Sequence, residues 1–147
     1  MFTLKGHTNW VLCVAWSPDA KFISTGSMDN TIRLWDSKTG KPYGSAMRGH
    51  TKWITALSWE PLHSWIETAR FASSSKDCTI RVWDASIRRI VMTMSGHSSA
   101  VTCVKWGGVG FIYSASHDKT VKVWDASDVS GVVLRTSEHA YQFPREN

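Results

Sequence analysis

Three segments of the chain each hold an aspartate, a histidine, a hydroxyl residue and a tryptophan at matching places. A carboxylate, an imidazole and a hydroxyl are the parts of a hydrolytic triad, in which the imidazole takes the hydroxyl proton. A nucleophile is not expected three times over, and no oxyanion hole is identifiable in the sequence, so we reject catalysis and predict that the chain is not an enzyme. The three sets are His7, Thr25, Asp29 and Trp35; His50, Ser73, Asp77 and Trp83; and His97, Ser114, Asp118 and Trp124.

Other patterns that could carry chemistry are weak. Gly107-Gly108-Val109-Gly110 has no following Lys-Ser/Thr and no helix, which favours a hairpin turn over a phosphate loop. The six histidines include no His-Glu-x-x-His, and the three cysteines form no Cys-x-x-Cys pair. We therefore expect no metal site and no cofactor. Cys13 and Cys103 occupy equivalent places, where we expect buried packing.

Composition excludes several classes of protein. The chain has 147 residues, 42% hydrophobic and 20% charged, which suits an ordinary folded domain. No apolar run approaches the roughly 20 residues of a membrane span, and the N-terminus lacks the pattern of a secretory signal. The net charge of +5 favours an anionic partner. Only Arg88-Arg89 form an adjacent basic pair, so a solvated surface is favoured over a nucleic-acid-binding arm.

An internal repeat supplies the elements that must position these side chains. Gly-His occurs at residues 6, 49 and 96, and each copy is followed later by Trp-Asp. Between them lie an apolar run ending in tryptophan, a small-residue run ending in aspartate and a β-branched alternating run. Such runs, bounded by turn residues, predict short antiparallel strands. A fourth strand is expected after each Trp-Asp, at about 43–48, 90–95 and 132–137.

Four strands in a unit of about 40 to 45 residues, with Gly-His near the start and Trp-Asp at the end, resemble the WD-repeat family of β-propellers. The resemblance implies an all-β fold, a partial propeller in which three four-stranded antiparallel blades form an open arc. We expect blades at about 9–48, 52–95 and 99–137, a leading strand at 2–5 and a non-repeat tail at 140–147. It also implies a structural network running from carboxylate to imidazole, hydroxyl and indole N–H.

By the same resemblance, residues at the start of each first strand and before each turn aspartate share one rim. Trp10 and Trp53 are its large aromatic residues, and for both we keep packing between blades and contact with a partner open. Aromatic and basic side chains together suit a protein hot spot or an RNA backbone. The partner-binding rim predicted here comprises Trp10, Met28, Lys52, Trp53, Lys76 and His117, with Ala100 at the third first-strand position.

Longer strings narrow the resemblance to the Notchless family of WD-repeat ribosome-assembly factors. The second repeat is the longest, with its extra residues at 60–68. The strings that carry the resemblance are Gly49–Thr55, Leu57–His63, Ser73–Asp77, Val101–Gly108 and Tyr113–Asp118.

That resemblance implies a non-catalytic scaffold in the nucleus and nucleolus that helps to assemble the large ribosomal subunit. Its expected partners are proteins, and ribosomal RNA, of the large-subunit precursor, with no membrane and no small-molecule substrate. The family engages a midasin-type ATPase through a ubiquitin-like domain, which these 147 residues lack, so we expect a fragment without that contact. The alternative is a generic WD-repeat adaptor that binds peptides in signalling or ubiquitin ligation.

Overall fold

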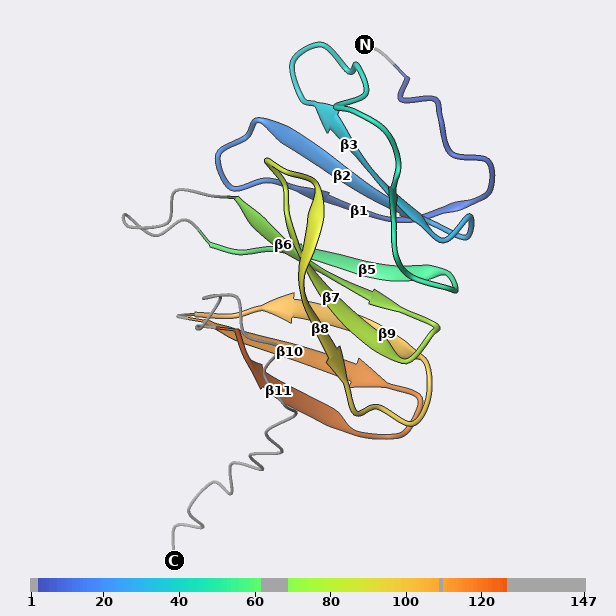
Figure 1. Cartoon of the computed structure of the whole chain (residues 1–147), viewed down its shortest axis with the longest axis vertical. Helices are drawn as coiled ribbons and strands as arrows, with labels where there is room; N and C mark the ends of the chain where they lie inside the picture. The colour runs from blue at the N-terminus through green and yellow to red at the C-terminus, as the bar shows by residue number, and fades with distance from the viewer. Residues whose placement is uncertain (1–2, 62–68, 109, 127–147) are drawn as a thin grey trace, which may run out of the picture.

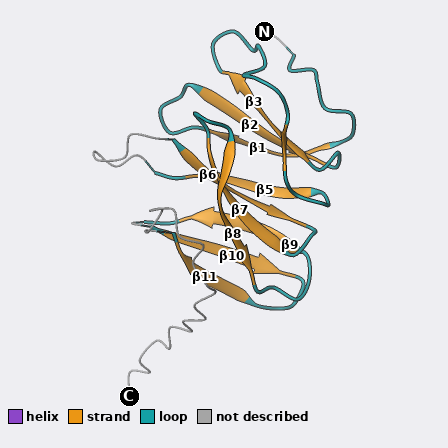
Figure 2. Ribbon diagram, viewed as in Figure 1, coloured by secondary structure: helices purple, strands orange, loops and turns teal. Residues whose placement is uncertain are grey.

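The alternating apolar runs form antiparallel strands. A computed structural model describes residues 3–61, 69–108 and 110–126, and within these ranges it contains strands and no helix (Figure 2). The strands are β1 (Val11–Trp16), β2 (Phe22–Ser27), β3 (Thr31–Asp36), β4 (Met47–Arg48), β5 (Ile54–Trp59), β6 (Arg70–Ser75), β7 (Thr79–Asp84), β8 (Arg89–Ser95), β9 (Val101–Trp106), β10 (Phe111–Ser116) and β11 (Val121–Asp125).

Each repeat forms one sheet whose strands pair in chain order. The first sheet is β1-β2-β3-β4, the second is β5-β6-β7-β8, and the third is β9-β10-β11. The second sheet lies between the other two (Figure 1), with β5 against β1 and β2, and β9 against β5 and β6. The predicted open, partial propeller is confirmed. The fourth strand expected at 132–137 lies outside the described residues.

Two strand predictions are wrong in detail. Residues 3–5, within the leading strand predicted at 2–5, form no strand, because no neighbouring strand in the described chain is available to pair with them. β4 covers two residues rather than 43–48. The chain touches the sheet at Pro42 and then leaves it at Gly44, which has a φ of 68–73° class geometry reserved mainly for glycine, at +73°.

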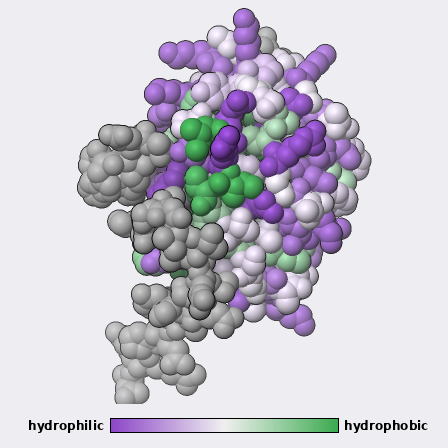
Figure 3. All heavy atoms as spheres, viewed as in Figure 1, coloured by the Kyte–Doolittle hydropathy of each residue, from purple (hydrophilic) through white to green (hydrophobic). Residues whose placement is uncertain are grey.

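Apolar side chains fill the two junctions between the sheets. Ile32, Leu34 and Met47 of the first sheet pack with residues of the second, including Trp59 and Phe71. The second junction has the same design, with Ile80 and Val82 packed near Val104. Burial of such side chains is the main source of stability in a stacked repeat protein. The side of the molecule seen in Figure 3 is mainly hydrophilic, with its most apolar surface in a small patch.

The same irregularity recurs in all three sheets. The pairing of each first strand with its neighbour shifts by one residue near the strand start, between Val11 and Cys13, between Ile54 and Ala56, and opposite Ala115 and Ser116. Such a bulge turns later side chains to the other face of the sheet. It aligns the first, fourth and sixth residues of each of these strands toward the preceding sheet, a pattern that a strict alternation of two would not produce.

Candidate functional site

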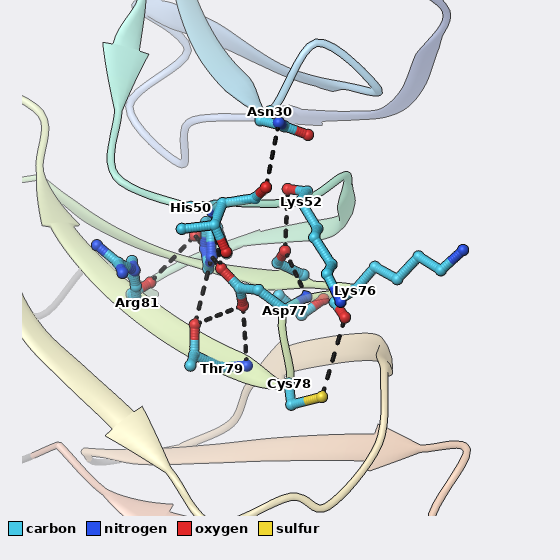
Figure 4. A network of polar contacts seen from close by, with 12 residues as sticks. Asn30, His50, Lys52, Lys76, Asp77, Cys78, Thr79 and Arg81 are labelled. Carbon is cyan, nitrogen blue, oxygen red and sulfur yellow. Dashed lines mark hydrogen bonds and ion pairs between the residues drawn. The ribbon is translucent and has the colours of Figure 1, made fainter.

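The second repeat shows how its polar residues meet. The Nδ1–H of His50 donates to Oδ2 of Asp77 at 2.8 Å, and its Nε2 lies 2.8 Å from Oγ of Ser73. Trp83 donates its indole N–H to the same Oγ at 2.8 Å. Because a carboxylate only accepts, the proton between His50 and Asp77 belongs to Nδ1. The loop before β5 is thereby tied to β6, β7 and the turn between them (Figure 4).

The other two repeats contain the same chain of contacts. In the first, His7 lies 2.8 Å from both Asp29 and Thr25, and Trp35 donates to Thr25 at 2.8 Å. In the third, the distances from His97 are 2.7 Å to Asp118 and 2.7 Å to Ser114, and Trp124 donates to Ser114 at 2.8 Å. The structure thus brings together all twelve residues that the sequence singled out for the networks.

Sequence reasoning missed two hydroxyl positions in each network. The threonine two residues after each aspartate donates to Oδ1 at 2.6 Å, and the serine two residues before it accepts the aspartate's backbone N–H. Their signal was the recurrence of Ser-x-Asp-x-Thr in every copy. The threonines are Thr31, Thr79 and Thr120, and the serines are Ser27, Ser75 and Ser116.

A close approach explains the glycine before each histidine. A Cβ placed on Gly49 would lie 2.8 Å from Nη1 of Arg81 and 3.1 Å from the ring of Trp83. A Cβ on Gly6 would meet Arg33 and Trp35 at 3.0 and 3.2 Å. The backbone before the histidine therefore lies directly on the third strand, which sets the imidazole within reach of the aspartate.

The environment keeps the network aspartates ionised. Burial alone would raise the pKa of Asp77, but hydrogen bonds from the side chains of His50 and Thr79 outweigh it, and the pKa lies well below the usual range. Asp29 has its pKa lowered by hydrogen bonds from Thr31 and His7, again against the raising effect of burial. The negative charge of each carboxylate is therefore a permanent part of the fold at neutral pH.

The arrangement matches the atoms of a catalytic triad but is closed to a substrate. The hydroxyl of Ser73 lies on a residue that is 0% exposed, and it already accepts the indole proton of Trp83. Thr25 and Ser114 are also buried. A nucleophilic hydroxyl has to approach the reacting carbon of its substrate, and these oxygens have no open side from which to do so.

The rim residues lie in pairs that repeat through the molecule. The backbone N–H before each turn aspartate donates to the carbonyl of the residue that starts the first strand, from Met28 to Trp10 at 2.9 Å, from Lys76 to Trp53 at 3.0 Å, and from His117 to Ala100 at 3.0 Å. The structure therefore brings each predicted pair together. The shared hydrogen bond fixes the spacing between the two side chains of a pair.

Trp53 and Lys76 form the most developed of these pairs. The Lys76 ammonium lies 4.3 Å from the ring centroid of Trp53, a cation–π contact, and Trp53 is 39% exposed. Lys52, next to it, is exposed and accepts a hydrogen bond from Ser75 through its carbonyl (Figure 4). Trp10 is 75% exposed, so it does not pack between sheets in the described structure.

The equivalent cysteines differ in burial. Burial raises the pKa of the Cys13 thiol to about 11, with an opposing hydrogen bond from the Gly26 backbone, so this thiol is protonated at neutral pH. The prediction that Cys103 is buried is wrong, because its side of the third sheet has no following sheet in the described residues.

Searches for two other kinds of site gave negative results within the described ranges. No three His, Cys, Asp or Glu side chains there are grouped so that they could hold a metal ion. No helix in those ranges is long and apolar enough to cross a membrane.

Comparison with known proteins identifies the repeat. The family described as "WD domain, G-beta repeat" matches residues 1–36, 40–84 and 88–125. The chain belongs to this family. It is 56% identical over 77% of its length to "Ribosome assembly protein 4" of Chaetomium thermophilum, 58% identical over 71% to the yeast Saccharomyces cerevisiae protein of that name, and 45% identical over 95% to "Protein Notchless" of Drosophila melanogaster.

These relatives are much longer proteins. The matched part of the chain spans 22% of the Chaetomium protein, 21% of the yeast protein and 37% of the Drosophila protein. A more distant relative, "Nuclear distribution protein nudF" of Aspergillus niger, is 32% identical over 73% of the chain. The three matched repeats correspond to the three sheets of the structure.

Proposed function

We propose that this chain is a non-catalytic protein-interaction scaffold that acts in assembly of the large ribosomal subunit, in the nucleus and nucleolus. The observation that carries the proposal is its 45% to 58% identity to relatives named for ribosome assembly or as Notchless. Identity to WD-repeat relatives with other names, such as the nuclear distribution protein, is 32%. The proposed partners are proteins and ribosomal RNA of the large-subunit precursor.

The geometry of the rim supports a binding role. Trp53 and Lys76 offer an aromatic face and a cation on one exposed edge, a combination that suits a protein hot spot or an RNA backbone. The network behind them supports the same role, because Asp77 follows Lys76 directly and is held by His50 and Thr79. A buried hydrogen-bonded lock therefore presents an exposed pair in a fixed position, as a recognition surface requires.

The test is affinity purification of the tagged chain from cell extract, with large-subunit precursor proteins and ribosomal RNA as the readout. We expect these components to be captured by the wild-type chain and reduced several-fold by the double variant Trp53→Ala/Lys76→Ala. The matched control is Lys38→Ala/Ile87→Ala, which removes an exposed lysine and an exposed apolar residue away from the rim.

Two results would contradict the proposal. Capture of a ubiquitin ligase or signalling protein without ribosomal precursors would favour the generic adaptor. Equal capture by the wild-type chain and by the rim variant would remove the Trp53–Lys76 pair from the binding surface while leaving the ribosomal association in place. Circular dichroism of each variant establishes that the fold is unchanged.

A further inference from the structure

The two junctions inside the molecule use the same positions. Toward the preceding sheet, the first strand of a blade presents three apolar side chains, and these are only 0% to 8% exposed in the second and third sheets. They are Ile54, Leu57 and Trp59 on β5, and Val101, Val104 and Trp106 on β9.

The surface that receives them is also repeated. On the first and second sheets it consists of one small residue of the second strand and two β-branched or leucine residues of the third strand, each 0% or 1% exposed. These are Ser24, Ile32 and Leu34 on the first sheet, and Ala72, Ile80 and Val82 on the second. At the first junction the indole N–H of Trp59 donates to Ser24 across the two sheets at 2.9 Å.

At the two ends of the arc the equivalent side chains are exposed. The first-sheet face consists of Val11, Val14 and Trp16, and the third-sheet face of Tyr113, Val121 and Val123. Their exposed fractions run from 39% to 69%. The two faces are on opposite sides of the three-sheet stack (Figure 1), so one cannot cover the other within one chain.

We propose that a second copy of this chain covers these faces head to tail, with the first-sheet face of one copy on the third-sheet face of the other. The reason is that this pairing of positions is the one already made twice inside the molecule, whereas neither face packs on its own kind there. Two copies would supply six blades, within the range of blade numbers at which propellers close. A head-to-tail contact whose rotation closes forms a ring and leaves neither face bare.

The chemistry at the centre of this contact fits. Trp16 occupies the place of Trp59, and Tyr113 occupies the place of Ser24, its acceptor. A phenolic oxygen accepts a hydrogen bond as a serine hydroxyl does. The larger ring of Tyr113 packs across Gly107, where an added Cβ would lie 2.5 Å from it, so the missing side chain at Gly107 makes room for the ring beside the face.

The test measures the mass of the 147-residue chain in solution by light scattering over a range of concentrations. The wild-type chain is expected to reach at least twice 16.5 kDa. Val14→Glu and Val121→Glu each place a charge on one face, at residues 68% and 69% exposed, so neither should unfold the monomer. Each variant alone is expected to stay monomeric, and an equimolar mixture is expected to form a one-to-one pair through the two intact faces.

Mixing separates this contact from the alternatives. If like faces paired, one variant alone would still dimerise through its intact face, and the proposal would be overturned. A wild-type chain that stayed at 16.5 kDa at every concentration would also overturn it. Ile87→Glu, which adds the same charge at an exposed site outside both faces, is the matched control and is expected to associate as the wild type does.

Discussion

At the scale of single residues, Asp77 has the largest share of a network. It accepts from His50, from the hydroxyl and backbone of Thr79 and from the backbone of Thr51. We expect Asp77→Ala to lower the free energy of unfolding by roughly 1 to 3 kcal/mol, because it leaves the buried imidazole without its acceptor. Urea denaturation followed by tryptophan fluorescence measures the effect.

The matched control for this change is the neighbouring variant Lys76→Ala. Its side chain is exposed and outside the network, so the expected change in the free energy of unfolding is within about 0.5 kcal/mol. An Asp77→Ala protein with the wild-type unfolding midpoint would contradict the structural role of the network.

The same carboxylates predict how stability depends on pH. Hydrogen bonding lowers the pKa of Asp29 and Asp77 in the folded state, against an unfolded value of about 3.9. A lowered folded pKa contributes stability that is present above the unfolded pKa and is lost as pH falls toward the folded one. We therefore expect the melting temperature to fall steeply below about pH 4, and Asp77→Asn to flatten that dependence. An equal slope in the variant would contradict this assignment.

The sequence predicted much of the network, and the reason is physical. Histidine, aspartate and tryptophan recur at matched spacing because each satisfies a buried partner in the same repeat, as for His50 and Asp77. Residues such as Thr79 escaped notice because hydroxyls at turns are common for many reasons. The short β4 was not predictable from its own repeat, since Gly44 lies against the guanidinium of Arg88 from the next one.

At the scale of elements, the two sheet junctions differ by one hydrogen bond. Trp59 donates to Ser24, whereas the buried indole N–H of Trp106 has no partner among the described residues, and Ala72 stands where Ser24 does in the repeat. We expect Ala72→Ser to stabilise the protein by about 1 kcal/mol by supplying an acceptor, and Ser24→Ala to destabilise it by about 1 to 2 kcal/mol. Thermal unfolding of both variants checks the pair.

Cavity and crowding effects have to be separated from the hydrogen bond. Ala72→Gly changes the same buried site without adding an acceptor, and it should destabilise the protein rather than stabilise it. If Ala72→Ser also proved destabilising, the indole of Trp106 would not be the beneficiary of the new hydroxyl.

At the scale of the whole molecule, the sheets are not equally protected. The second sheet is packed on both sides, whereas Val14 and Val121 on the outer sheets face solvent. In a stacked array each unit is stabilised by its nearest neighbours. We expect backbone amides of β6 and β7 to exchange with deuterium more slowly than the equivalent amides of β2, β3, β10 and β11 in dilute protein. Uniform protection across the three sheets would contradict this gradient.

The repeated junction also bears on how such a chain can change over evolutionary time. Every sheet presents the same kind of surface to its successor, and every first strand presents the same kind of apolar triplet to its predecessor, as Leu34 and Leu57 do at the first junction. An in-frame duplication or loss of one whole repeat would therefore bring together surfaces that already fit. The number of blades can change by single genetic events, while a substitution at one junction, such as tyrosine at position 113, can make that end selective for its neighbour.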